Sequence, residues 1–135
     1  MRYLLPIIFC AVFFIPANAR VCVQETQTAD GVMGPGFIPA AWCRVRRQGN
    51  IVQLDIGAAR AAAGIMADRA VWCTIPDGFR PSVALNTPVV WRAFGANSGV
   101  TGIVAVLTNG EVVQISEINT PGSTSSGSIQ VTFIQ

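Results

Sequence analysis

The sequence contains no histidine, which removes most of the familiar catalytic arrangements. A serine or cysteine nucleophile with a histidine base cannot be assembled without one. Paired carboxylates could still act as general acid and base, and the acids within the expected domain are Asp55, Asp68, Asp77, Glu111 and Glu117. Asp77 precedes a glycine and Glu111 follows one, so turn geometry already accounts for both. We therefore expect a protein that is not an enzyme.

The four cysteines are Cys10, Cys22, Cys43 and Cys73. They include no close pair with metal-ligand spacing, so we expect no metal site and no other cofactor. In an oxidising compartment cysteines pair, and we favour Cys43 with Cys73, because both lie in expected strands. A bridge from Cys22 to either one stays open, since sequence does not decide connectivity. The remaining thiol is either an interchain bridge or a buried, unpaired cysteine.

All nine basic residues are arginine, and the net charge is only +2. No basic footprint for nucleic acid is present, so we expect no nucleic-acid partner. The one cluster is Arg44, Arg46 and Arg47, and a strand places Arg44 and Arg46 on the same face. This cluster is either a solvated outer face or a site for an anionic sugar or a lipopolysaccharide phosphate, which suits the planar guanidinium.

The N-terminal residues 1–19 combine Arg2, an apolar run and an Ala17-Asn18-Ala19 site, which is typical of a cleaved secretory signal peptide. The run is too short for a membrane span, so we expect no stable anchor after cleavage and a secreted or periplasmic chain. Residues 20–41 are rich in Gly and Pro towards their end, and we interpret them as an extended arm or linker.

Beyond the arm, the hydrophobic pattern has a period of two and predicts short strands. We expect them at about 42–47, 50–56, 70–74, 89–93, 102–107, 112–117 and 128–134. The alanine-rich stretch 57–69 is predicted as a short helix or a loop, and 120–127 as a flexible polar connection. Seven short strands with frequent turns indicate an all-β domain over residues 42–135, an antiparallel sandwich or barrel of jelly-roll type.

Two stretches with turn-forming residues separate the expected strands. The stretch Thr74–Ser82 contains Pro76, Gly78 and Pro81 and predicts an extended corner that ends a strand. Asn109-Gly110 lies between two apolar runs and predicts a hairpin with a type I′ turn.

Together with the hairpin-like stretch Cys43–Leu54, these two signals resemble the C-terminal or head domains of phage tail fibres and baseplate receptor-binding proteins. The resemblance covers about residues 42–135. It implies a virion-associated binding module that attaches to a cell-surface glycan or lipopolysaccharide. With the high apolar content, it also implies a homotrimer.

Sugar sites combine an aromatic platform with hydrogen-bonding side chains, and the candidates near loops are Arg80, Trp91, Arg92 and Asn97. Two of these have a structural alternative, since Trp91 could pack in the core and Arg80 could hold the corner. The alternative function is a structural assembly or decoration protein without glycan binding. Apolar outward positions on the last strands, without an aromatic-lined groove, would favour that alternative.

Overall fold

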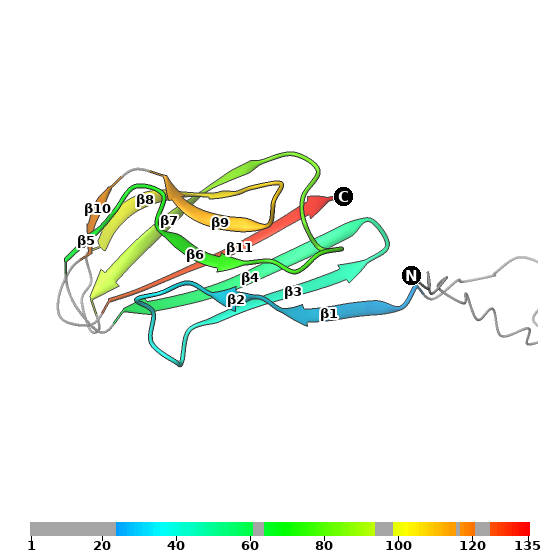
Figure 1. Ribbon diagram of the computed structural model, residues 1–135, viewed down its shortest axis with the longest axis horizontal. Helices are drawn as coiled ribbons and strands as arrows, with labels where there is room; N and C mark the ends of the chain where they lie inside the picture. Colours follow the sequence, from blue (N-terminus) through cyan, green and yellow to red (C-terminus); the bar gives the residue numbers. More distant parts are fainter. Residues whose placement is uncertain (1–23, 61–63, 94–98, 116, 121–124) are drawn as a thin grey trace, which may run out of the picture.

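The computed structural model describes residues 24–60, 64–93, 99–115, 117–120 and 125–135, and this part of the chain is entirely β (Figure 1). Nine strands form one curved, nearly closed antiparallel sheet, so the predicted all-β sandwich or barrel is confirmed. The strands are β1 (Thr26–Asp30), β2 (Val32–Met33), β3 (Trp42–Gln48), β4 (Ile51–Arg60), β5 (Gly64–Met66), β6 (Val71–Thr74), β7 (Leu85–Ala93), β8 (Gly99–Val106), β9 (Glu111–Ile115), β10 (Ile118–Thr120) and β11 (Ser125–Ile134). β5 and β10 form a separate two-stranded sheet.

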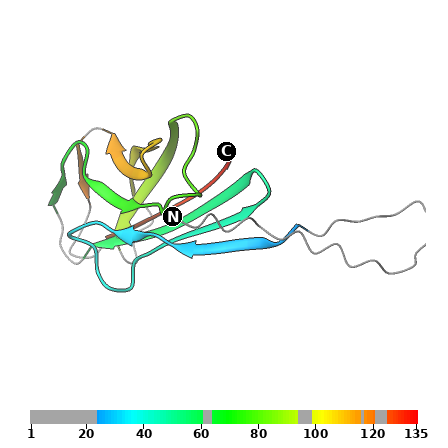
Figure 2. The same cartoon turned by 45° about the vertical axis from the view of Figure 1, so that its right-hand side comes forward.

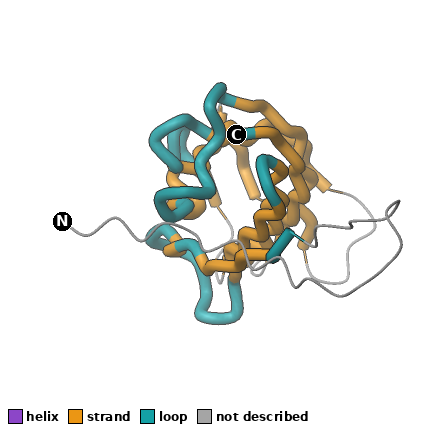
Figure 3. The backbone as a smooth tube through the Cα atoms, turned by 90° about the vertical axis from the view of Figure 1, so that its right-hand side faces the viewer, coloured by secondary structure: helices purple, strands orange, loops and turns teal. Residues whose placement is uncertain are grey.

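The curved sheet has two layers, seen end-on in Figure 3. The first layer is β1, β3, β4 and β11, in which β4 and β11 pair over their full ten-residue lengths. The second layer is β7, β8, β9, β6 and β2. The layers join where β11 pairs with β7, and this pairing covers only two residues of each strand. Pro88 therefore lies where β7 has already separated from β11, a place that tolerates a missing backbone donor.

The two layers also meet on the side opposite the pairing of β11 with β7. There, the segment that contains β1 and β2 pairs with both layers. β1 pairs with β3, and after Gly31 the chain continues as β2 and pairs with β6. The backbone N–H of Gly31 donates to the Cys43 carbonyl at 2.8 Å. A Cβ on Gly31 would overlap the Cys43 side chain and the Thr74 carbonyl, so only glycine fits this crossing.

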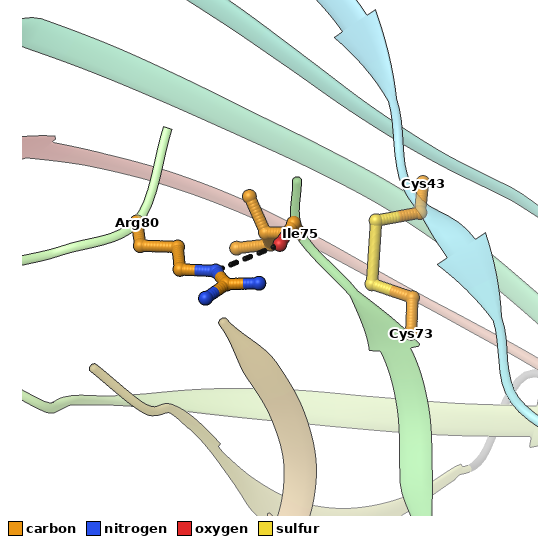
Figure 4. Close-up of a disulfide and its surroundings, with 4 residues drawn as sticks. All are labelled: Cys43, Cys73, Ile75 and Arg80. Carbon is orange, nitrogen blue, oxygen red and sulfur yellow. Dashed lines mark hydrogen bonds between the residues drawn. A yellow bond between two sulfur atoms is a disulfide. The ribbon is translucent and has the colours of Figure 1, made fainter. Parts of the chain in front are cut away.

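A disulfide between Cys43 and Cys73 joins β3 to β6 beside this crossing, with the two Cα atoms 6.4 Å apart (Figure 4). The favoured cysteine pairing is therefore confirmed. Both cysteines are buried within the core between the layers. Within the same core, the rings of Trp72 and Trp91 meet edge to face with their centroids 5.0 Å apart. The disulfide thus joins the first layer to the second, while the tryptophan pair packs β6 against β7 within the second layer.

The predicted hairpin and corner are both present, and they contact each other. Gly110 has a φ of 90°, but Asn109 does not have a positive φ, so the predicted type I′ turn is wrong. The N–H of Gly110 donates to the Leu107 carbonyl, which gives a type I turn followed by a left-handed glycine. The Gly110 carbonyl accepts from the N–H of Ile75 at 2.8 Å, so the hairpin tip docks on the proline corner.

All seven predicted strands are present, whereas three predicted irregular stretches contain strands. The helix or loop expected at 57–69 contains the end of β4 and all of β5, because pairing with β11 and β10 overrides the preference of alanine for helix. The polar connection expected at 120–127 contains the start of β11. Residues 26–33, expected in an arm ahead of the domain, pair with both layers, so the sheet begins at Thr26.

The expected signal peptide, residues 1–19, lies outside the described residues, as do Cys10, Cys22 and Asn97. No helix in the described ranges is long and apolar enough to cross a membrane. Within the same ranges, no group of three or more Cys, Asp or Glu side chains could hold a metal ion.

Candidate functional site

The outer surface of the first layer carries polar and aromatic side chains in rows that run across the strands. Strand alternation produces the rows, because each apolar side chain of β3 and β4 that points inward leaves its neighbour pointing outward. Pairing then places Trp42 opposite Gly57, which is opposite Ser128 of β11. One of these rows therefore offers an aromatic ring beside a hydroxyl group.

Trp42 lies across the backbone of Gly57. A Cβ at position 57 would overlap the Trp42 ring, so the absence of a side chain lets the indole approach the sheet. Trp42 remains 42% exposed, whereas Trp72 and Trp91 are completely buried. Of these three tryptophans, Trp42 is thus the one that can contact a ligand in solvent.

A groove of about 590 Å³ runs beside Trp42, at the corner where β7 separates from β11. We call it the Trp42 groove. Its lining combines apolar surface from Trp42 and Val90, the Arg92 guanidinium, and the hydroxyl-bearing residues Ser126 and Ser128. Arg92, Ser126 and Ser128 are exposed. This mixture of an aromatic platform with donors and acceptors matches what a sugar ring requires.

Next to the Trp42 groove, a second hollow of about 530 Å³ is lined by charged and amide side chains. Its central row places Arg44 directly between Asp30 of β1 and Asp55 of β4. The Arg44 guanidinium also lies 5.9 Å from the centroid of the Trp42 ring, within the range of a cation–π contact. The following row places Arg46 between Thr28 and Gln53, without a carboxylate. The two hollows therefore adjoin at Trp42 and Arg44.

Of the two possibilities for Trp91, the structure shows core packing. Its side chain has no exposed surface and packs against Trp72 in the core. The inward direction follows from β7, in which Val89 and Trp91 point into the core while Val90 and Arg92 point outward. Trp42 was missed, although it shares its strand face with Arg44 and Arg46, and this alternation is the signal that could have found it.

The other candidate residues lie in different places. Arg92 lines the Trp42 groove. Arg80 instead holds the corner, because its Nε donates to the Ile75 carbonyl at 3.2 Å (Figure 4) and its guanidinium pairs with Asp77. Its carbonyl accepts from Gln135 at 2.9 Å, which ties the corner to the end of β11. The structure therefore brings Arg92 together with Trp42 and keeps Arg80 apart from them.

The outer surface of the second layer carries an apolar row across its strands. Pairing across β7, β8 and β9 aligns Pro88, Ile103 and Ile115 in one row, which we call the Ile103 row. Ile103 is 46% exposed and Ile115 is 37% exposed. The outward positions of these later strands are thus apolar, and the molecule carries both an aromatic groove and an apolar row.

The sandwich is similar in fold to two phage receptor-binding domains. One is the head domain of the lactococcal phage bIL170, with a TM-score of 0.57 and 9% identity. The match covers 82% of this chain and 98% of that chain. It is also similar to the receptor-binding protein gp15 of Listeria phage PSA, with a TM-score of 0.53 and 11% identity over 84% of this chain and 68% of that chain. No family model matches the sequence, and no curated protein matches it. At these identities the likeness shows the fold alone, and the fold agrees with the resemblance drawn from the sequence.

Proposed function

We propose that the chain is a non-enzymatic binding module that attaches to a cell-surface glycan or lipopolysaccharide, in the manner of a phage tail-fibre tip. The observation that carries the proposal is the Trp42 groove. An exposed indole presents a flat apolar face to a sugar ring, while Arg92, Ser126 and Ser128 offer hydrogen bonds to its hydroxyl groups. The fold shared with phage receptor-binding domains supports the same function.

Binding to a glycan array, followed by titration calorimetry with the best ligand, tests the proposal. We expect Trp42→Ala to weaken the affinity at least about tenfold, as truncation of a central aromatic contact does. Ile134→Ala is the matched control, because Ile134 is 70% exposed and points outward from the same layer, away from the groove lining. Equal losses from both variants, or no loss from Trp42→Ala, would contradict the assignment of the groove.

The same proposal includes self-association as a homotrimer, supported by the Ile103 row. An exposed apolar row on a sheet is a surface that another copy can cover. Light scattering of the wild type and of Ile103→Asp tests this step, and we expect the variant to dissociate to the monomer. A wild-type monomer at micromolar concentration would contradict the trimer without affecting the glycan test.

A structural assembly or decoration role is the second candidate function, and the Ile103 row also favours it. The two functions differ in their outcomes. An assembly protein would lose association on Ile103→Asp and show no glycan binding that depends on Trp42. Localisation, virion-associated or secreted, is tested by the intact mass of the protein from producing cells, which reports whether residues 1–19 are removed.

A further inference from the structure

The second hollow, which we call the Arg44 hollow, lies beside the Trp42 groove on the outer surface of the first layer. β1, β3 and β4 run side by side in this layer (blue to green in Figure 2). Trp42 and Arg44 are two residues apart in β3 and both are exposed, so the rows that pass through them lie about 7 Å apart. A ligand with one ring on Trp42 therefore meets the Arg44 hollow with its next unit.

Most side chains of the Arg44 hollow end in a planar polar group. They are Asp30, Arg44, Arg46, Gln53, Asp55 and Gln130. A guanidinium presents paired donors, a carboxylate presents paired acceptors, and an amide presents both kinds of atom. Each hydroxyl group of a sugar can donate and accept, so one planar group can hold two neighbouring hydroxyl groups at once. The hollow thus offers what the polar edge of a sugar ring requires.

These polar groups are open to a ligand. Pairing places Arg44 between Asp30 and Asp55, yet among the described residues no hydrogen bond or ion pair joins its guanidinium to either carboxylate. In the neighbouring row, Arg46 and Gln53 lie opposite each other, and both are exposed. Water satisfies such groups in the free protein, and the hydroxyl groups of a sugar can take its place.

The charges of the hollow indicate which kind of sugar it suits. Its two arginines and two aspartates cancel in formal charge. An anionic group drawn to Arg44 would meet a carboxylate on each side, at Asp30 and at Asp55, and like charges in contact oppose binding. A neutral sugar avoids this repulsion and can use the donors and the acceptors together. The surroundings of Arg44 therefore favour an uncharged sugar over the anionic one that the arginine cluster alone suggests.

We propose that the Arg44 hollow binds a second, uncharged sugar unit of the ligand, next to the unit that lies on Trp42. This inference rests on the proposed glycan function and gives the class of its ligand, a neutral oligosaccharide that extends from the Trp42 groove into the Arg44 hollow. Trp42 contacts the face of one ring, whereas the hollow binds hydroxyl groups on the edge of the next. Such hydrogen bonds select among sugars, because an analogue without the hydroxyl leaves polar groups unpaired.

Calorimetry tests the proposal with three kinds of probe. They are the neutral oligosaccharide that binds best on the glycan array, its fragments shortened one unit at a time, and the same oligosaccharide carrying a carboxylate. We expect Gln53→Ala to weaken binding of the full oligosaccharide about threefold to tenfold, as loss of one or two hydrogen bonds does. Binding of the shortest fragment that still binds should not change, which also shows that the variant is folded.

The matched control is Gln48→Ala, since Gln48 is an exposed glutamine of the same layer that lines neither hollow. A second variant tests the charge argument. We expect Asp55→Asn to reduce the preference for the neutral oligosaccharide over its carboxylated form about threefold, because one of the two repelling carboxylates is removed.

A loss from Gln53→Ala that appears only with the longer oligosaccharides, without a loss from Gln48→Ala, would support the second sugar site. Equal affinity of the wild type for the full oligosaccharide and its shortest fragment would overturn it, as would tighter binding of the carboxylated form. Both of these results leave binding dependent on Trp42. Failure of the proposed glycan function differs, because binding would then be absent or independent of Trp42, and the second site would fall with it.

Discussion

The two layers of the sandwich differ in what their outer surfaces offer. In the first layer most apolar residues of β3 and β4 point inward, and the outer face carries Trp42, Arg44 and Asp55. In the second layer several outward positions are apolar as well, and they form the Ile103 row. Alternation decides which side a residue faces, whereas the residue type on the outer side decides what that side can bind. The proposed glycan site lies at the first surface and the proposed protein contact at the second.

Both surfaces depend on the same core, and removal of Trp91 should weaken it most. Trp91 is completely buried against Trp72 and lies under Gly127 of β11. We expect Trp91→Ala to lower the free energy of unfolding by about 3–5 kcal/mol, because it leaves a large cavity between the layers. Trp42→Ala, at the exposed position, should lower it by no more than about 1 kcal/mol. Urea denaturation of both variants measures the difference.

Equal costs at the two positions would contradict the contrast between a core and a surface tryptophan. Ligand binding by Trp91→Ala gives a second test of this contrast. If Trp91→Ala retains its fold under mild conditions, it should still bind the ligand of the wild type, because its side chain does not reach the groove.

Removal of the disulfide tests how much it stabilises the contact between β3 and β6, beside the segment that contains β1 and β2. Cys43 and Cys73 are separated by 30 residues, and closure of a loop of that length is worth about 3–4 kcal/mol in the chain-entropy model. We expect the double variant Cys43→Ala, Cys73→Ala to lose that much stability in thermal or urea unfolding. Cys22→Ser is the control, and a comparable loss from it would contradict the pairing as the source of the effect.

The contrast between the layers also explains which features could be predicted from the sequence. The strand Trp42–Gln48 alternates Cys43 and Val45 inward with arginines outward, so its faces could be assigned in advance. In β7 the run Pro88-Val89-Val90-Trp91 is apolar on both faces, and sequence could not tell which side Trp91 takes. Local pattern left Trp91 open between a ligand contact and core packing, because the choice between faces is made by tertiary packing against Trp72.

Partner choice between distant segments was equally beyond a local pattern. The glycines and prolines after Thr28 are typical of a linker, yet Gly31 is needed where the chain passes the disulfide, and Gly34 donates to Trp72. The end of β4 is rich in alanine and favours helix in isolation. Its strand conformation comes from pairing with Ser125–Ser128, which are small residues too. In both segments contacts far apart in sequence override local preference.

The smallest expected effect concerns the backbone under the groove. Gly57→Ala places a methyl group where the Trp42 ring lies, so the ring must move away from the sheet. We expect stability to change by less than about 1 kcal/mol, because alanine also restricts the unfolded chain. Affinity for the groove ligand should fall about threefold to tenfold in calorimetry, since the aromatic platform loses its position beside Ser128.

Because Gly57 acts through Trp42, its effect should depend on that ring. In the Trp42→Ala background, Gly57→Ala should cause no further loss of affinity, as expected for two residues in direct contact. An equal loss in both backgrounds would mean that position 57 contributes independently of the indole. The double-mutant cycle thus distinguishes a groove built around one exposed tryptophan from a polar surface of the first layer in which Trp42 has no special place.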